Sequence, residues 1–185
     1  MASRAPSSDS GSDDPRRRVS VHTGDITRQA VDAIVNAANS ALKRGGGVDG
    51  AIHAAAGPAL QAELDGIGGC PTGDCRLSHG HALPAPWIIH AVGPVWHGGT
   101  ADEDTLLESC YRTALALARR HGLRTLAFPA ISTGIYGFPK ERAASIAVAA
   151  VLDELGKDDA VAEVRFVCFD DETAEIYRGI LSKDP

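Results

Sequence analysis

Short apolar runs alternate with longer amphipathic stretches along this chain. The short runs are rich in Val, Ile and Phe, which is typical of β-strands because branched and aromatic side chains pack well on a pleated surface. No internal repeat is visible among them. The pattern predicts strands over residues 19–22, 33–35, 77–82, 87–92, 125–131 and 164–169.

The stretches between these runs predict helices. Apolar residues recur at helical spacing over residues 107–118, and Gly122 follows as a natural end of that helix. A second helix is expected from Pro139 to about Gly156, since the fixed φ of proline suits a first helical position, and a third over residues 173–181. Strands separated by helices need crossover connections, so we expect an α/β fold with a mixed, largely parallel sheet and helices on both faces.

Length and composition indicate one domain. A chain of 185 residues, of which 44% are hydrophobic, can bury one core and not obviously two. Residues 1–18 are rich in Ser and Asp, end in Pro15-Arg16-Arg17-Arg18 and hold almost nothing to bury. We therefore expect a disordered arm over residues 1–18, with its basic triplet in solvent, followed by the domain over residues 19–185.

Charge and apolar length exclude other classes of protein. The formal net charge of −6 argues against a nucleic-acid binder, because Lys and Arg contacts to phosphates supply most of the affinity of such proteins. No apolar run approaches the roughly 18 residues of a membrane span, and residues 1–18 lack the apolar centre of a signal peptide. We expect a cytoplasmic protein, a monomer by default, with no membrane partner.

One group of residues has the side chains of a zinc site. Cys70, Cys75, His79 and His81 are close in sequence, but the gap between the two cysteines is four residues, wider than the usual two. With no export signal, the cysteines are expected to be reduced thiols. We therefore expect no metal.

Two glycine-rich loops stand where strands are expected to end. Residues 45–47 are all glycine and open a helix, so free N–H groups and the helix dipole favour a phosphate there. The loop lacks the Lys-Ser/Thr ending of a P-loop and the spacing of the dinucleotide fingerprint, so neither an NTPase nor a dehydrogenase follows from it. Residues 132–137 form a second small-residue loop between a strand and a helix, and two such loops can clamp one diphosphate.

The order of four motifs resembles the macrodomain family, particularly its MacroD-type hydrolase branch. The motifs are Gly24-Asp25-Ile26-Thr27, Val35-Asn36-Ala37-Ala38-Asn39, the segment from Gly45 to His53, and Ser132-Thr133-Gly134-Ile135-Tyr136-Gly137. Each alone occurs widely, but this order makes coincidence improbable. The resemblance spans about residues 19–181 and implies a three-layer α/β/α fold with an ADP-ribose cleft.

The resemblance also implies a role for each site residue. Asp25 is expected on the adenine amino group, which suits a carboxylate acceptor, with the Ile26 backbone on the ring and Phe169 stacked on the adenine. Asn39 and Asp49 are expected at the distal ribose as catalytic residues. The residues whose backbone would hold the diphosphate are Gly46, Gly47, Val48, Ser132, Thr133, Gly134, Ile135 and Tyr136, the last also packing beside the sugar.

The activity implied is hydrolysis of mono-ADP-ribose esters of Asp or Glu side chains and of O-acetyl-ADP-ribose, without a cofactor. A carboxylate leaves easily because its conjugate acid has a pKa of about 4, whereas a guanidine of pKa above roughly 12 needs strong acid assistance. Asn39 would fix the ribose hydroxyls, and Asp49 would either orient a water or partly deprotonate it. Asn36 is interpreted as structural, bonded to local backbone, and His53 as a packed, hydrogen-bonded side chain.

Two other functions fit the same residues. A non-catalytic reader would recognise ADP-ribosylated proteins without cleaving them, and a small-molecule esterase would act on ADP-ribose derivatives such as the O-acetyl ester. The polar pair Asn39 and Asp49 favours an enzyme, by analogy with the family. The expected partners are ADP-ribose and ADP-ribosylated proteins, with a nucleic acid expected only as an ADP-ribosylated substrate.

Overall fold

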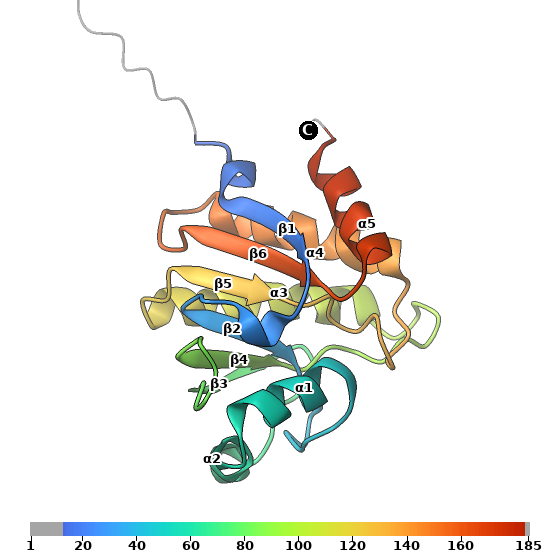
Figure 1. Ribbon diagram of the computed structural model, residues 1–185. Coiled ribbons are helices and arrows are strands. Elements are labelled where there is room, and N and C mark those ends of the chain that lie inside the picture. The colour runs from blue at the N-terminus through green and yellow to red at the C-terminus, as the bar shows by residue number, and fades with distance from the viewer. Residues whose placement is uncertain (1–12, 184–185) are drawn as a thin grey trace, which may run out of the picture.

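A six-stranded sheet forms the centre of the molecule (Figure 1). The computed structural model describes residues 13–183. The strands are β1 (Val19–Thr23), β2 (Ala33–Ala37), β3 (Cys75–His79), β4 (Trp87–Ala91), β5 (Thr125–Phe128) and β6 (Glu163–Cys168). Their order is β1-β6-β5-β2-β4-β3, and all neighbours pair in parallel except β3 with β4. The prediction of a mixed, largely parallel sheet is confirmed.

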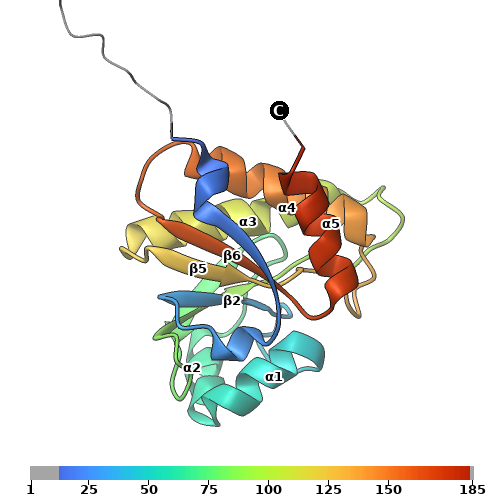
Figure 2. The ribbon, with the colours of Figure 1, turned by 45° about the horizontal axis from the view of Figure 1, so that its top comes forward.

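Helices cover both faces of this sheet. The helices are α1 (Gly47–Ala56), α2 (Ala59–Ile67), α3 (Glu103–Arg120), α4 (Lys140–Leu155) and α5 (Asp171–Leu181), with short 3-10 helices η1 (Pro15–Arg18) and η2 (Ile26–Arg28). Figures 1 and 2 show α3, α4 and α5 on one face and α1 and α2 on the other. This is the expected three-layer arrangement. Within residues 13–183, no helix combines the length and apolar character needed to cross a membrane.

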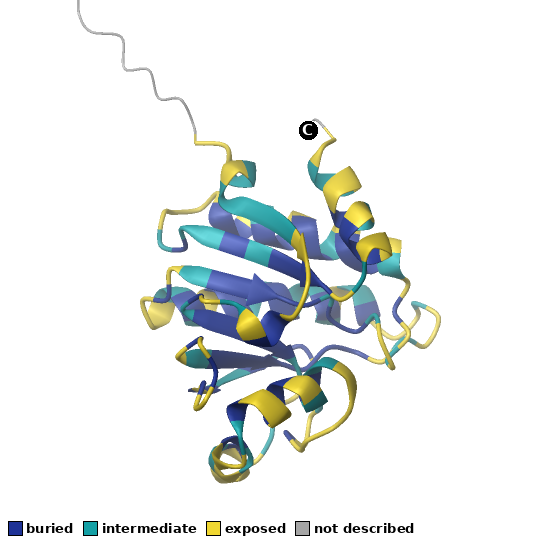
Figure 3. Ribbon diagram, viewed as in Figure 1, coloured by how far each residue is buried: buried dark blue, intermediate teal, exposed yellow. Residues whose placement is uncertain are grey.

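Burial is concentrated on the two faces of the sheet (Figure 3). The cluster under α3, α4 and α5 contains aromatic rings packed at a tilt, with centroids 5.1 Å apart for Tyr111 and Phe128 and 4.7 Å apart for Phe166 and Tyr177. The opposite cluster joins aliphatic residues of the strands to α1 and α2. Since each face is buried, the strands read as nearly continuous apolar runs, as the sequence pattern indicated.

Some predicted boundaries are wrong by a few residues. Strand β5 ends at Phe128 instead of residue 131, because Pro129 has no N–H for the ladder. Strand β3 lies two to three residues earlier than expected. Helix α2 was not predicted, since Gly57 and Pro58 read as a turn; the spacing of its two buried residues, Leu60 and Leu64, was the available signal.

The predicted arm is wrong for its last residues. Residues 1–12 lie outside the described part of the chain, but Pro15–Arg18 form η1. The Arg18 guanidinium donates to the carbonyls of Val161 at 2.8 Å and Asp158 at 3.1 Å, so it bonds the loop after α4 instead of only solvent. The Arg16 side chain donates to the Lys183 carbonyl at 3.4 Å, which brings the two ends of the described chain together. Such distant carbonyl partners cannot be read from local composition.

A buried carboxylate connects α3 to α4. Glu154, only 5% exposed, accepts hydrogen bonds from Arg112 at 3.0 Å, Arg119 at 2.7 Å and Lys157 at 2.7 Å. Burial alone would raise the pKa of this carboxyl, but the hydrogen bonds from Lys157, Arg119 and Arg112 outweigh burial and lower the pKa to about 2.

We expect Glu154→Gln to destabilise the fold in a pH-dependent way. The folded-state pKa lies below the unfolded value of about 4.3, so the stability from this group is present above about pH 5 and is lost as the pH falls toward 2. The loss in unfolding free energy should be about 2–3 kcal/mol at pH 7 and about half that at pH 3, measured by urea denaturation. The control Glu108→Gln, at an exposed ion pair, should cost less than about 1 kcal/mol; equal losses for Glu154→Gln at both pH values would contradict the assignment.

Candidate functional site

The carboxyl ends of the parallel strands bring the predicted site residues to one edge of the sheet. Strands β1 and β6 pair with Thr23 opposite Cys168, and the Gly24 N–H donates to the Cys168 carbonyl at 2.9 Å. Asp25 comes just after β1 and Phe169 just after β6, so both residues lie at the same end of the sheet. The loops after β5 and β2 follow across the sheet, in the strand order. Ligands of parallel α/β sheets bind at this edge.

The first glycine loop leads into α1 without a side-chain cap. Gly46 is the N-cap residue, and no side chain accepts from the first turn. Gly47 has φ +57°, a conformation that favours glycine, and a Cβ there would point into open space. Within the described residues, the N–H groups of Gly46, Gly47 and Val48 have no acceptor. Three free donors at the positive end of a helix are an environment that suits an anion.

The second loop is held by its own backbone. Phe138 N–H donates to the Ser132 carbonyl at 2.9 Å, and Trp96 N–H donates to the Tyr136 carbonyl at 2.8 Å. Ser132 has φ +66° and a buried Oγ without a hydrogen-bond partner in the described structure, whereas the Thr133 hydroxyl donates to the carbonyl of residue 130 at 2.8 Å. The strained serine and the internal hydrogen bonds fix the path of the loop.

The two loops face each other across the edge. In the described part of the chain, the N–H groups of Gly134, Ile135 and Tyr136 find no acceptor. A Cβ built on Gly46 would lie 3.8 Å from Ile135 Cδ1. Two sets of free N–H donors therefore lie on neighbouring loops, which is the arrangement that the sequence predicted for a diphosphate.

Two large apolar side chains at this edge are almost fully exposed. Phe169 is 91% exposed and Ile135 is 86% exposed. Most large apolar side chains in the described chain are buried, so two of them at one edge suggest a surface that a ligand covers. The exposed ring of Phe169 is free to stack on a planar group.

Asp25 offers one free carboxylate oxygen beside Phe169. Its Oδ1 accepts from the Thr27 hydroxyl at 2.6 Å and from the Thr27 N–H at 2.9 Å. These two hydrogen bonds, the hydroxyl first, lower the pKa of Asp25 below its ordinary value. Its Oδ2 lies 3.7 Å from Arg28 Nε and is open to a donor such as an exocyclic amine. The Ile26 side chain, by contrast, is buried, which leaves its backbone for contacts.

Asp49 is a buried carboxylate in the first turn of α1. It is 6% exposed, and its Oδ1 accepts from Asn36 Nδ2 at 2.7 Å while its Oδ2 accepts from Gly45 N–H at 2.6 Å. The His53 ring lies one turn further, with Nε2 3.5 Å from Asp49 Oδ1. Two donors fix the carboxylate, yet each oxygen keeps a free lone pair for a water or hydroxyl.

The interpretations of Asn36 and His53 need correction. Asn36 does not bond local backbone: its fully buried amide contacts two side chains, Asp49 on α1 and His90 on the neighbouring strand β4. His53 is packed as expected, but its Nε2 has no hydrogen-bond partner in the described structure. Both residues therefore belong to the surroundings of Asp49.

Asn39 lies near Asp49 and holds its own loop. Its Nδ2 donates to the Lys43 carbonyl at 2.7 Å and its Oδ1 accepts from the Lys43 N–H at 3.1 Å. A Cβ built on Gly45 would lie 3.5 Å from Asp49 Oδ2 and 3.6 Å from Asn39 Nδ2, so the two side chains converge at Gly45. One amide hydrogen and one lone pair of Asn39 stay available for a ligand.

The residues of the rejected zinc site are in two separate environments. Cys70 and Cys75 are buried, and burial raises the pKa of both thiols. His79 Nδ1 lies 3.1 Å and His81 Nε2 lies 2.9 Å from the Glu63 carboxylate, which occupies both rings. The four side chains do not converge on one point.

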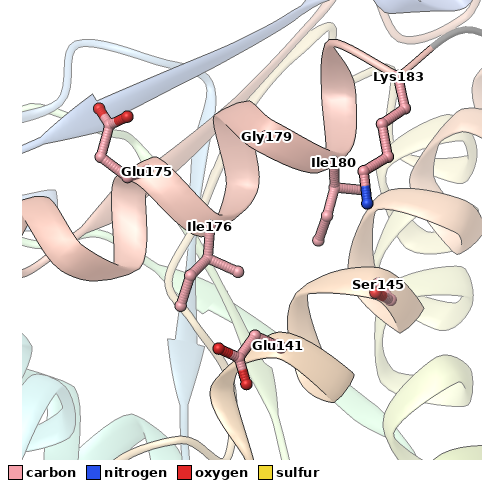
Figure 4. Close-up of a pocket in the computed structure, with 7 residues that line it drawn as sticks. All are labelled: Glu141, Ser145, Glu175, Ile176, Gly179, Ile180 and Lys183. Carbon is pink, nitrogen blue, oxygen red and sulfur yellow. The ribbon is translucent and has the colours of Figure 1, made fainter.

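Two cavities differ in their relation to this edge. One, of about 260 Å³, lies between α4 and α5 and contains none of the predicted site residues (Figure 4). The other, of about 290 Å³, is lined by Arg44, His53, Ala54, Gly57, Pro58 and Gln61. It also contains none of the predicted site residues, and its link to the edge is His53, whose Nε2 lies 3.5 Å from Asp49 Oδ1.

The loop after β4 lies very close to the second glycine loop. A side chain added at this contact should therefore destabilise the fold. A Cβ on Gly93 would lie 2.2 Å from Ser132 Oγ and 2.6 Å from Ile131 Cγ2, distances that no packing tolerates. We expect Gly93→Ala to lower the unfolding free energy by about 2 kcal/mol or more, measured by denaturant unfolding. The control Gly24→Ala, at the same edge, meets nothing within 4 Å and should change it far less; equal effects would show that the close approach is absent.

Known proteins match this chain over most of its length. The family model of the Macro domain matches residues 35–147. A macro domain-containing protein of Cupriavidus necator is 59% identical over 163 residues, covering 86% of this chain and 94% of the relative. An O-acetyl-ADP-ribose deacetylase of Klebsiella pneumoniae is 52% identical over 166 residues, with 88% and 95% covered. The Trypanosoma brucei macrodomain solved in complex with ADP-ribose has a TM-score of 0.86 and 40% identity, with 90% and 70% covered. The chain therefore belongs to the macrodomain family.

Proposed function

We propose that this macrodomain binds ADP-ribose and hydrolyses acyl esters on its distal ribose. The observation that carries the proposal is the pair of facing loops with free N–H donors, at Gly46–Val48 and at residues 134–136. A diphosphate offers acceptors on both phosphates and satisfies donors from both loops at once. The name of the Klebsiella pneumoniae relative and the ADP-ribose complex of the Trypanosoma brucei neighbour support the same ligand.

The two ends of the edge suit the two ends of that ligand. Asp25 and the exposed Phe169 lie at the β1 and β6 side, where a carboxylate and an open ring suit an adenine. Asn39 and Asp49 lie beyond the first glycine loop from this side, where they would meet the distal ribose. Both ends would be fixed by the diphosphate between them, which orients the ester for reaction.

We propose that Asp49 positions the attacking water and that Asn39 holds the ribose hydroxyls. The Asp49 carboxylate is fixed by Asn36 and by Gly45 N–H, so its remaining lone pairs have a defined direction. A water bound there attacks the ester carbonyl and the acyl–oxygen bond breaks; the acyl carbon keeps the water's OH and becomes a carboxylic acid, while the expelled ribose oxygen takes up the water's other proton. The substrates proposed are O-acetyl-ADP-ribose and ADP-ribose esterified to Asp or Glu side chains.

Binding is tested at the first glycine loop. We expect Gly47→Glu to weaken ADP-ribose binding by at least about 100-fold, because the new carboxylate would point into the space where a phosphate meets the backbone and would also strain a residue at φ +57°. Isothermal titration calorimetry measures the affinity. The control Gly66→Glu adds the same charge on α2, where a Cβ meets nothing within 4 Å; normal affinity of Gly47→Glu would refute the phosphate site.

Turnover is tested at the distal end. We expect Asp49→Ala and Asn39→Ala to reduce kcat for O-acetyl-ADP-ribose by about 100-fold or more while the Kd for free ADP-ribose changes less than about fivefold, because the diphosphate and adenine contacts remain. Acetate release and calorimetry give the two quantities, with Asp104→Ala as a control at an exposed carboxylate. Equal losses of rate and affinity would contradict the assignment.

The same measurements distinguish the proposed hydrolase from a non-catalytic reader of ADP-ribosylated proteins. A reader would bind ADP-ribose normally, yet release no acetate and no label from modified protein.

The specificity for the linkage is tested with one protein ADP-ribosylated on carboxylates and another on arginine. Because the proposed water attacks an acyl carbon, which an arginine–ribose linkage lacks, we expect release from the first alone; release from the arginine-linked protein would overturn the proposed ester specificity.

A further inference from the structure

Three buried polar side chains lie in a row on an otherwise apolar face of the sheet. Asn36 on β2 pairs directly with His90 on β4, and Ser78 on β3 pairs with Ile88, two residues before His90 on the same face. Their exposed fractions are 0% for Asn36, 0% for His90 and 1% for Ser78. Neighbours on this face, such as Ile34 and Ile88, are aliphatic. Polar groups at such depth are costly unless they are bonded to one another.

The hydrogen bonds in this row can be assigned one consistent direction from donor to acceptor. Asn36 Nδ2 donates one hydrogen to Asp49 Oδ1 at 2.7 Å and lies 3.1 Å from His90 Nδ1. His90 Nε2 lies 2.8 Å from Ser78 Oγ, and the Ser78 hydroxyl donates to the His79 carbonyl at 3.2 Å. The Ser78 proton is therefore committed, so His90 Nε2 must carry a hydrogen and donate. Nδ1 of a neutral ring is then an acceptor, and it takes the second Asn36 hydrogen.

The Asp49 carboxylate excludes the opposite orientation of the Asn36 amide. If the Asn36 amide turned over, its Oδ1 would lie 2.7 Å from Asp49 Oδ1 and against the bare His90 Nδ1, so three acceptors would meet. The present orientation leaves Asn36 Oδ1 without a donor in the described structure, which is the smaller penalty. Burial lowers the pKa of His90 to about 3, with His53 adding to the shift, so the ring stays neutral at working pH.

We propose that Ser78 and His90 are positioning residues of the reaction: through Asn36 they hold the Asp49 carboxylate in the orientation that presents its free lone pairs to the attacking water. The row begins at a backbone carbonyl of the edge strand β3 and ends at α1, so it connects the rigid sheet to the helix that carries Asp49. This inference rests on the proposed function of Asp49. Neither residue touches the ligand, so their removal acts on rate and not on ADP-ribose affinity.

The first test compares two substitutions of His90. His90→Asn keeps an acceptor at the position of Nδ1, whereas His90→Leu has similar size and no acceptor. We expect His90→Leu to lower kcat for O-acetyl-ADP-ribose by about 10- to 100-fold, with KM and the Kd for ADP-ribose within about threefold, and His90→Asn to recover most of the rate. Losses of the same size in both variants, or a kcat for His90→Leu within about twofold of the wild type, would overturn the proposal.

A second pair of variants covers the case in which His90→Leu does not fold. Ser78→Ala removes only the hydroxyl that accepts from His90 and should lower kcat about three- to tenfold. The matched control Ser109→Ala removes a hydroxyl that donates to the Gly73 carbonyl at 2.7 Å, away from Asp49. It should leave kcat unchanged. Equal effects of the two serine variants would contradict the proposal.

A spectroscopic measurement separates this proposal from the proposed function. Long-range ¹H–¹⁵N correlation of the histidine rings in the wild-type protein should show His90 as the neutral Nε2–H tautomer at every pH from 5 to 9. A hydrogen on Nδ1 would overturn the row of contacts whatever the activity. If the ring has the expected tautomer but the wild type releases no acetate, the proposed hydrolysis is wrong, and with it the role of Ser78 and His90 in rate.

Discussion

Backbone N–H groups at the start of α1 have no acceptor among residues 13–183, and the arrangement of the site depends on this. The first turn of any helix leaves such donors, and most proteins satisfy them with a capping side chain. Here glycines replace the cap, and the facing loop supplies more free donors at Gly134 to Tyr136. Since parallel strands all end at this edge, the two loops come together without long connections.

Asp49 lies at the same helix start, and one hydrogen bond to each of its oxygens holds the carboxylate in place. Its carboxylate complements the helix dipole and accepts from Asn36 and Gly45, which makes burial of the charge tolerable. The orientation of the Asn36 amide in turn depends on the neutral imidazole of His90 on the neighbouring strand β4. The sheet fixes the positions of the loops and of α1 relative to each other. The buried polar contacts contribute to the same positioning.

The strands, helices α3, α4 and α5, the start of α1 and the two glycine loops were predictable from the sequence, because apolar periodicity and glycine position are local signals. The partners of Arg18 and Asn36 were not, since the Val161 carbonyl and the His90 ring are distant in sequence and meet these residues only after the sheet has formed. A polar residue inside the apolar run of β4 was the one available signal for His90. Helix α2 was missed because its preceding Gly57-Pro58 resembles a turn.

Both ends of the described chain lie at the side of the sheet opposite the glycine loops. Strand β1 begins there, α5 returns there after β6, and the Arg16–Lys183 contact joins the two ends (Figures 1 and 2). A fusion partner or surface tether attached at either end would consequently leave from the back of the molecule. A linker joining the two ends would need to be only a few residues long, so the topology suits circular permutation with new termini elsewhere on the surface.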